Sequence, residues 1–391
     1  MIEWTKEKII DNFLVTDFVA NGSFASLKEN VSYLKEPDYA ILVRTTDNTK
    51  GWNGKYVFVS KDSYEFLKKS SLKPNDLIIA NVGDPGKAFL CPDLRQPMTL
   101  GPNSILVRPL NENKINNKFF YFYTTSKIGQ AQIEDICSAT AQKKFNKTSY
   151  RNIEIPLPPI DQQKKIAAIL DAADAYRQKT KALITKYEEL TQSLFLDMFG
   201  DDTGTLTELG KVIKTVGGGT PSKDNEQYWN GNIPWASVKD LKSDRLTKTQ
   251  DFITQSGVDN SATRVVPNGS LIVATRMAVG RAVICEMDVA INQDLKAIQT
   301  TGKINITYLL YLFKSKKNYF DSVSSGATVK GIKIEHITKL KVNLPNYSKQ
   351  NQFADSVKAI EAQKAQAQAS LAKAEDLFNS LLQRAFKGEL S

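Results

Sequence analysis

The sequence contains few of the residues on which metal and redox sites depend. Among its 391 residues there are three cysteines and one histidine, His336. These are too few for a disulfide scaffold or for a zinc site of the usual composition. No apolar run approaches the roughly 20 residues of a membrane-spanning helix, and the first residues lack the apolar core of a secretory signal peptide. We therefore expect an intracellular protein that binds no metal of its own.

Basic residues are in excess. The chain has 52 Lys and Arg against 42 Asp and Glu, which gives a formal net charge of +10. Such an excess is typical of proteins that bind a polyanion. With 41% hydrophobic and 24% charged residues, the composition is that of a folded globular protein, and the length predicts two or three domains.

The chain contains an internal repeat. Residues 77–91 resemble residues 271–285 at an offset of 194, with Leu, Ile, Ala, Gly, a basic residue, Ala and Cys in register. Residues 155–159 resemble residues 342–346 at an offset of 187, so the second copy is seven residues shorter in between. Residues 21–24 fall opposite the glycine run 217–219 at the first offset. Three matches in the same order indicate a duplicated unit.

Each copy begins with a mixed α+β region. Short β-branched and aromatic runs, such as 56–59, 77–80 and 104–107, are separated by Gly, Pro and Asn turns. A helical stretch follows around 119–123, with its counterpart around 306–310. Cys91 and Cys285 occupy the same strand position, which favours buried small apolar residues.

Each copy ends in one long helix. The first is expected to begin with Asp161 as its N-cap and to end near Gly200, and the second to run from Ser348 to Gly388. Apolar residues recur every three or four positions along both. The residues expected to pair the helices or to bind a partner are Ile166, Leu170, Ala173, Leu183, Tyr187, Leu194, Phe353, Val357, Ile360, Leu371, Leu377 and Leu381.

The order of domain, helix, domain, helix predicts an arrangement. If the helices pair antiparallel, the two domains lie at opposite ends of a shared coiled coil of roughly 60 Å and are related by a pseudo-twofold axis. The expected boundaries are 1–157, 158–200, 201–344 and 345–391. A turn of B-DNA spans about 34 Å, so two DNA-reading domains would touch the duplex one to two turns apart. The alternative is an ordinary helical bundle packed on the domains.

Three segments carry a resemblance to a known family. Residues 217–222 and 228–241, which read GGGTPS and YWNGNIPWASVKDL, resemble the start of a target recognition domain of the specificity (S) subunits of type I restriction-modification enzymes. Residues 155–163, IPLPPIDQQ, resemble the beginning of the family's first conserved helical region. The resemblance spans essentially the whole chain in the expected order.

The resemblance implies a non-catalytic, DNA-binding subunit without a cofactor of its own. Each recognition domain reads one half of a split DNA site, and the paired helices set the gap and dock two methyltransferase (M) subunits. Those subunits hold S-adenosylmethionine and methylate adenine, and restriction (R) subunits supply ATP-driven translocation and cleavage with Mg²⁺. It further implies a location with the DNA in a bacterial or archaeal cytoplasm.

DNA binding requires Lys and Arg for phosphates and long polar side chains for base edges. Arg276 follows a predicted strand and is expected at a guanine edge, with Arg281 on a phosphate; solvated surface residues are the alternative. The matching loop of the first copy differs at Asn81 and has Lys87 opposite Arg281. The expected DNA contacts are Gly22, Ser23, Arg44, Asn81, Lys87, Gln142, Lys143 and Lys144 in the first copy, and Thr220, Ser222, Lys223, Lys239, Thr275, Arg276, Arg281, Thr328 and Lys330 in the second.

Other functions have weaker support in the sequence. Pro92-Asp93 and Glu112-Asn113-Lys114 have the spacing of a metal-dependent nuclease motif, but the second part reads as a flexible loop. The glycines at 217–219 lack the Lys-Ser/Thr that a nucleotide-binding loop needs. Trp229 and Trp235 are expected to be core anchors. A scaffold or decoy with the same fold, acting outside restriction, remains open.

Overall fold

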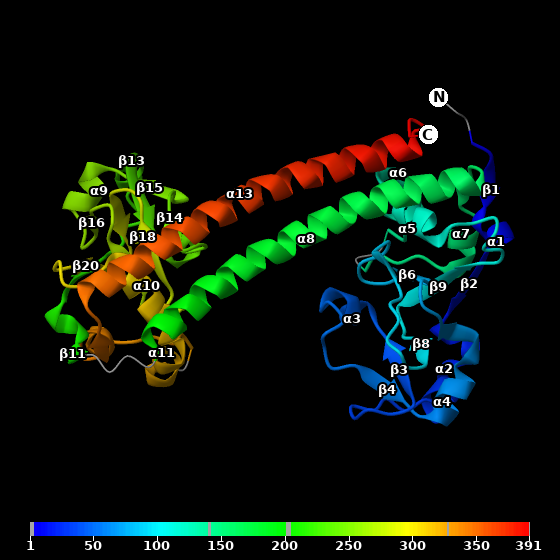
Figure 1. Ribbon diagram of the computed structural model, residues 1–391, viewed down its shortest axis with the longest axis horizontal. Helices are drawn as coiled ribbons and strands as arrows, with labels where there is room; N and C mark the ends of the chain where they lie inside the picture. Colours follow the sequence, from blue (N-terminus) through cyan, green and yellow to red (C-terminus); the bar gives the residue numbers. More distant parts are fainter. Residues whose placement is uncertain (1–3, 140–141, 201–204, 327, 391) are drawn as a thin grey trace. The chain divides into compact units, whose positions relative to one another are not determined.

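The computed structural model describes residues 4–139, 142–200, 205–326 and 328–390 (Figure 1). The chain divides into two compact units. Unit 1 comprises Met1–Thr180 and Ser370–Ser391, and unit 2 comprises Lys181–Ala369. Each unit therefore contains one α+β domain together with part of each long helix. In the described part of the chain no helix is both long and apolar enough to span a membrane.

The domain of unit 1 is built on two four-stranded sheets. The first sheet has the order β2 (Phe13–Asp17), β9 (Ser104–Pro109), β6 (Leu77–Ala80), β7 (Ala88–Leu90), and the second has the order β4 (Val57–Val59), β3 (Ala40–Val43), β8 (Met98–Leu100), β5 (Ser71–Leu72). Only the β3–β8 pair is parallel within these two sheets. A separate pair joins β1 (Lys6–Lys8) to β10 (Glu154–Pro156). The helices are α1 (Ile9–Asn12), α2 (Phe24–Asn30), α3 (Thr45–Thr49), α4 (Lys61–Phe66), α5 (Asn117–Thr125), α6 (Lys127–Asp135) and α7 (Lys147–Arg151).

The domain of unit 2 repeats this topology. Its first sheet has the order β12 (Ile213–Gly217), β20 (Leu295–Thr300), β17 (Leu271–Ala274), β18 (Ala282–Cys285), with β14 (Arg245–Leu246) added at the edge. Its second has the order β15 (Asp251–Ile253), β13 (Trp229–Ala236), β19 (Val289–Ile291), β16 (Arg264–Val266), and β11 (Thr205–Glu208) pairs with β21 (Lys341–Leu344). The shorter helices are α9 (Gln255–Asp259), α10 (Ile306–Ser315), α11 (Lys317–Val323) and α12 (Ile334–Thr338). The predicted fold class, two tandem α+β domains each followed by a long helix, is confirmed.

The sheet register corrects one part of the repeat. Asp17 lies opposite Ile105, and Gly217 lies opposite Lys296. On β9, Ile105 lies two residues before Val107, which pairs with Leu77 of β6. On β20, Lys296 lies two residues before Ile298, which pairs with Leu271 of β17. Asp17 is therefore the equivalent of Gly217, so the alignment of residues 21–24 with the glycine run was wrong. Strand register is fixed by the sheet, whereas the loops between strands differ in length in the two copies.

The central strands are buried on both faces. In β6, Leu77 and Ile79 belong to the core that contains α5, whereas Ile78 belongs to the core under the second sheet. In β17, Leu271 and Val273 face the core that contains α10, and Ile272 faces the other. Successive residues of a strand point to opposite sides, so an unbroken apolar run is what a strand between two cores requires.

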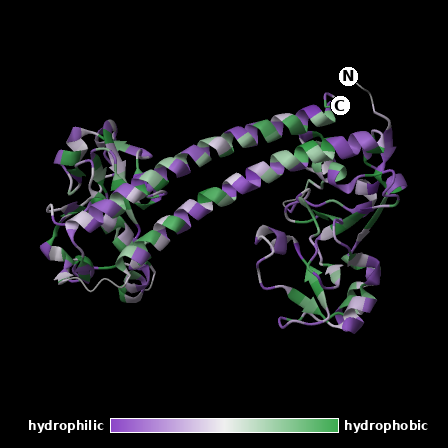
Figure 2. Cartoon of the chain, in the orientation of Figure 1, coloured by the Kyte–Doolittle hydropathy of each residue, from purple (hydrophilic) through white to green (hydrophobic). Residues whose placement is uncertain are grey.

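The long helices are α8 (Ile160–Phe199) and α13 (Tyr347–Phe386), each of 40 residues. Both alternate between hydrophilic and hydrophobic residues along their length (Figure 2). The observed ends lie within two residues of the predicted ones, although Asp161 is inside the first turn and is not the N-cap. The helix begins two residues earlier than an N-cap at Asp161 would place it, because the carbonyl of Pro159 already accepts from Gln163 N at 3.0 Å.

The two long helices pack against each other within each unit. In unit 1, the Tyr176 hydroxyl is 3.0 Å from Ser370 Oγ. In unit 2, Lys364 Nζ donates to Glu188 Oε1 at 2.6 Å, and Phe195 packs on Phe353 with ring centroids 5.5 Å apart. Because positions later in α8 meet positions earlier in α13, the pairing is antiparallel, as predicted.

Candidate nucleic-acid interface

In unit 1, the loop after β6 lies against the segment before α7. Asn81 N donates to Asn103 O at 3.1 Å, and Asn81 Nδ2 donates to Phe145 O at 3.3 Å. Val82 and Lys144 form an isolated antiparallel bridge. The fold thus brings together Asn81 and the exposed residues Gln142, Lys143 and Lys144.

Basic side chains surround this loop. Lys143 is ion-paired with Glu134, and hydrogen bonding to that carboxylate raises the pKa of Lys143. Lys87 Nζ donates to Thr49 Oγ1 at 3.2 Å. Lys144 is exposed. The loop and its neighbours therefore carry cationic groups, whereas the Asn81 amide is directed into the protein, with its nitrogen bonded to Phe145 O and its oxygen buried.

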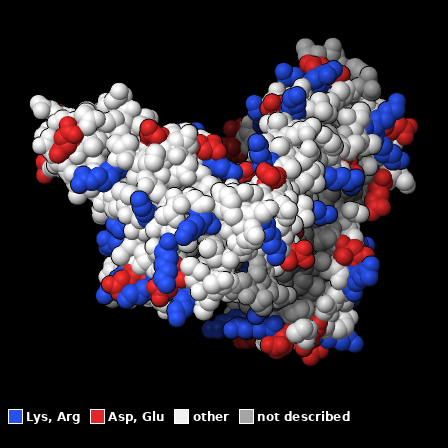
Figure 3. Space-filling view, turned by 60° about the vertical axis from the view of Figure 1, so that its left-hand side comes forward, with Lys and Arg blue, Asp and Glu red and all other residues white. Residues whose placement is uncertain are grey.

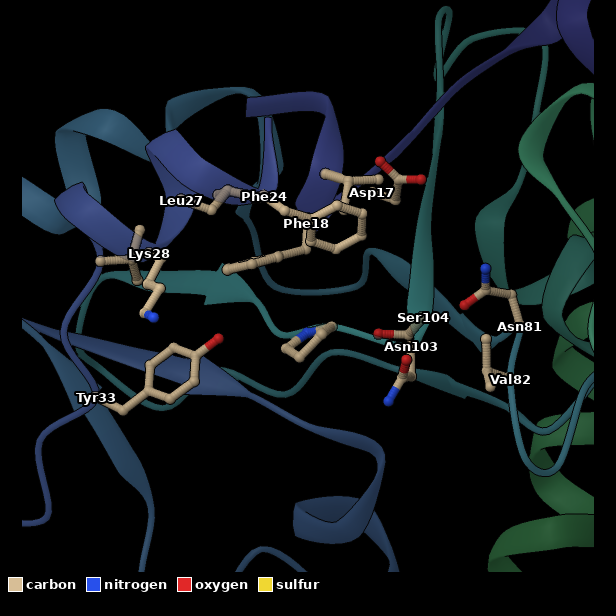
Figure 4. A pocket seen from close by; sticks show the side chains of 13 residues that line it. Asp17, Phe18, Phe24, Leu27, Lys28, Tyr33, Asn81, Val82, Asn103 and Ser104 are labelled. Atoms are coloured by element: carbon tan, nitrogen blue, oxygen red, sulfur yellow. The ribbon is translucent and has the colours of Figure 1, made fainter. Parts of the chain in front are cut away.

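A hollow of about 480 Å³ opens beside Asn81 (Figure 4). Phe18 and Phe24 lie along one wall, and Asn103 and Ser104 lie opposite them. The side chain of Phe24 is 84% exposed. The predicted contacts Gly22 and Ser23 do not line this hollow. Ser23 is the N-cap of α2, and its side chain accepts from Ser26 N. Neither Phe24 nor Asn103, which do line the hollow, was among the predicted contacts.

In unit 2, the loop after β17 makes the equivalent contacts. Thr275 N and Oγ1 donate to Asp294 O at 2.8 and 3.0 Å. Arg276 forms an isolated bridge with Gly331, and Met277 N donates to Lys330 O at 3.2 Å. The predicted residues Thr275, Arg276 and Lys330 are therefore brought together, with Thr328 nearby in sequence.

The two arginines of this loop differ in their surroundings. Arg276 Nη1 donates to Asp294 Oδ1 at 3.3 Å, and the Arg276 side chain is 53% exposed. The carboxylate holds one side of the guanidinium and leaves the rest open to solvent. The guanidinium of Arg281 donates to the carbonyl of Leu241. Arg281 therefore helps to fix the loop as well as contributing a positive charge.

A larger hollow of about 1130 Å³ lies beside this loop within unit 2. Its basic lining residues are Lys242, Arg245, Arg281, Lys314, Lys317, Lys330 and Lys364. Several are already paired, for example Lys314 with Asp244 at 2.5 Å and Arg245 with Glu361 at 2.9 Å. On the face of the molecule drawn in Figure 3, groups of Lys and Arg side chains alternate with Asp and Glu.

The glycine run 217–219 begins at the end of β12, and two tryptophans hydrogen-bond to the backbone of this segment. Trp235 Nε1 donates to Gly219 O at 3.2 Å, Trp229 Nε1 donates to Ser222 O at 2.9 Å, and the two rings meet edge to face at 5.2 Å. A Cβ on Gly218 would lie 2.2 Å from Ile291 O. Glycine is needed there for a close backbone approach, which accounts for the motif without a nucleotide.

The remaining predicted residues contact other segments of the two domains. The hydroxyl of Thr220 donates to Gln293 Oε1, and Ser222 and Lys223 are exposed. Lys239 Nζ lies 2.7 Å from Asp251 Oδ2, and this hydrogen bond raises the pKa of Lys239. Arg44 is engaged by Asp47 at 2.7 Å and by the carbonyl of Lys55, so its guanidinium stabilises the start of α3.

The proposed nuclease motif is not assembled in the described residues. Asp93 Oδ1 accepts from Arg95 N at 2.9 Å, and Lys114 pairs with Glu7 at 2.6 Å. No group of three or more His, Cys, Asp or Glu in the described ranges could hold a metal ion. Both repeat cysteines are buried, as predicted, and burial raises the pKa of the Cys91 thiol to about 12.

If Lys144 binds a DNA phosphate, its replacement should have a recognisable effect on DNA affinity. Replacing Lys144 by alanine should weaken binding to all DNA sequences alike, because phosphates carry no sequence information. It should also reduce the slope of log affinity against log salt by about 1. Titrations of duplex DNA at several salt concentrations measure both. Lys339→Ala, an exposed lysine paired with Glu335 on α12, is the control and should leave the slope unchanged.

Comparison with known proteins identifies similar chains. A family model described as the type I restriction modification DNA specificity domain matches residues 11–191 and 202–375. The EcoR124I/EcoR124II specificity subunit of Escherichia coli is 25% identical over 269 residues, which cover 64% of either chain. The putative MjaX specificity subunit of Methanocaldococcus jannaschii is 23% identical over 384 residues, 92% of this chain and 87% of that one. The match to the MjaIX specificity subunit covers 36% of that relative's length.

Solved structures share the fold. The S subunit of a type I restriction-modification system from M. genitalium aligns with a TM-score of 0.56 at 16% identity, covering 98% of this chain and 96% of the other. A chain from a structural study of type I R-M system assembly aligns with a TM-score of 0.60 at 17% identity, covering 100% and 99%. At these identities the similarity establishes the fold alone.

Proposed function

Because this chain belongs to the type I restriction-modification DNA specificity family, we propose that it is the specificity subunit of a type I restriction-modification complex. In this proposal each α+β domain reads one half of a bipartite DNA site. The observation that carries the proposal is the pair of equivalent loops after β6 and β17. Their backbone contacts are the same, with Val82 bridged to Lys144 and Arg276 bridged to Gly331, whereas their side chains differ.

The side chains at these loops suit DNA recognition. In unit 2, Arg276 is oriented by Asp294 and keeps donors free for the O6 and N7 acceptors of a guanine. In unit 1, Val82 occupies the position of Arg276 and Asn81 that of Thr275, with Lys87, Lys143 and Lys144 as cations for phosphates. The same backbone arrangement with different side chains would give the two domains different half-sites on the same scaffold.

Partner docking is proposed for the long helices. Exposed apolar residues of α8 recur every seven positions, at Ile169 and Tyr176 in unit 1 and at Leu183 and Leu190 in unit 2. Exposed apolar side chains on a helix are typical of protein interaction sites. We propose that they bind the two M subunits, and that the length of the paired helices, about 60 Å at 1.5 Å per residue, sets the gap between the half-sites.

The predicted helix residues do not all suit a partner. Leu183 and Leu377 are exposed, at 42% and 55%. Ala173, Tyr187, Leu194, Ile360, Leu371 and Leu381 are half-buried. Ile166, Leu170, Phe353 and Val357 are buried inside their own units. These four hold a helix to its own domain, so docking is proposed for the exposed residues.

Catalysis is assigned to the partners. The M subunits would bring S-adenosylmethionine, and R subunits would bring ATP and Mg²⁺. This chain would select the DNA sequence, in the cytoplasm where the DNA lies.

We expect the purified chain with Mg²⁺ and S-adenosylmethionine neither to cut nor to methylate DNA. Adding M subunits should start methyl transfer, measured with radiolabelled S-adenosylmethionine. Cleavage by the chain alone, abolished by Asp93→Ala, would contradict the proposal.

A further inference from the structure

Two buried glutamines occupy equivalent positions in the first turns of the long helices. Gln163 lies in α8 and Gln350 lies in α13, at the offset of 187 residues that relates the proline segments before them. Their side chains are 1% and 0% exposed. A buried amide is costly unless its oxygen and nitrogen are both hydrogen-bonded, so the partners of these two side chains reveal what they hold.

In unit 1, Gln163 joins three segments. Its Oε1 accepts from Asn116 N at 2.9 Å, and its Nε2 donates to Lys114 O at 3.0 Å and to Pro158 O at 2.8 Å. Asn116 is the N-cap of α5, with its Oδ1 accepting from Phe119 N at 2.9 Å. One side chain therefore ties the long helix to the proline turn before it and to the start of a core helix of the domain.

In unit 2, Gln350 makes the same connections. Its Oε1 accepts from Asn305 N at 2.8 Å, and its Nε2 donates to Pro345 O at 2.9 Å and to Lys303 O at 3.5 Å. Asn305 is the N-cap of α10. It adds a second tie, because its Nδ2 donates to Asn351 Oδ1 at 2.9 Å. The arrangement is thus repeated in both copies.

We infer that Gln163 and Gln350 are positioning residues that fix the angle of each recognition domain on the long helix that leaves it. Hydrogen bonds depend on direction, whereas the apolar contacts around them do not. Three bonds from one amide to two separate loops restrict rotation of the helix against the domain. Given the proposed function, that angle determines where the domain meets the duplex, and hence how many base pairs between half-sites are accepted.

The test compares DNA duplexes whose half-sites are separated by the native spacer or by one base pair more or fewer. Full-length chain is assembled with M subunits, and methyl-transfer rates are measured for wild type, Gln163→Met and Gln350→Met. Methionine has a similar length but cannot make the three bonds. We expect the preference for the native spacer to fall about tenfold in each variant, a change of about 1.4 kcal/mol.

Leu100→Ala is the matched control. Leu100 is fully buried in the core under the second sheet of unit 1, so its truncation lowers stability without touching the helix start, and spacer preference should be unchanged. If the glutamine variants lower all rates equally and keep the wild-type preference, the inference is wrong and the glutamines only stabilise. If wild type itself accepts no split site, the proposed function fails instead.

Discussion

Replacing Phe353 by alanine should cost about 3–5 kcal/mol of folding free energy, the range for large core aromatics. Phe353 is fully buried, and its ring lies 5.5 Å from those of Phe195 and Phe199 and 5.3 Å from that of Tyr311. These rings join α8, α13 and α10 within unit 2. Truncation would leave a cavity where the two long helices meet the domain. Urea unfolding followed by circular dichroism measures the loss.

Leu377→Ala separates folding from docking. Leu377 lies on the same helix but is 55% exposed, so its truncation should change stability by no more than about 0.5 kcal/mol. It should instead weaken assembly with M subunits, measured by analytical ultracentrifugation. Equal loss of stability in Phe353→Ala and Leu377→Ala would contradict the assignment of one residue to the core and the other to a partner surface.

Arg276→Ala should weaken recognition of one half-site by about 1–3 kcal/mol, the value of a bidentate base contact. The side chain is half-exposed and is oriented by Asp294, so its donors are arranged before DNA binds. The loss should appear only for DNA carrying the half-site read by unit 2. Competition binding with duplexes altered in one half-site at a time measures it for the chain assembled with M subunits.

Arg281→Ala is the informative comparison. Its guanidinium binds the carbonyl of Leu241, so its removal should reduce affinity for both native and altered sites. If Arg276→Ala also weakens binding to every sequence equally, Arg276 contacts phosphate and does not read a base.

The repeat, the fold class and the long helices could be predicted because each depends on local pattern. Apolar runs such as 77–80 predict strands, and spacing by three and four predicts both helices to within two residues. The glycine alignment failed because it assumed one offset, whereas Asp17 and Gly217 are equivalent at an offset of 200 through sheet register. Strand register depends on hydrogen bonds between strands that are distant in sequence. A short sequence motif does not reveal which residues of those strands pair.

The candidate site could be predicted only in part. The sequence predicts DNA-reading loops at Asn81 and Arg276 because their flanks repeat while their side chains differ. Their contacts with Asn103 and Asp294 were missed, since those residues are distant in sequence. Periodicity also could not tell whether an apolar helix residue faces its own domain or a partner, so Ile166 and Leu170 were grouped with Leu183. The prediction of a DNA contact at Arg44 did not anticipate its bond to Asp47.

The most direct measurement is a map of methylated adenines in the genome of a host that carries this chain with its M and R subunits. Two recognition domains on one chain predict a single split motif, with two short defined half-sites separated by a fixed number of unspecified base pairs. Exchanging the domain of unit 2 for that of a relative should alter one half-site and leave the other unchanged. A contiguous motif, or a change in both half-sites after the exchange, would contradict two independent readers.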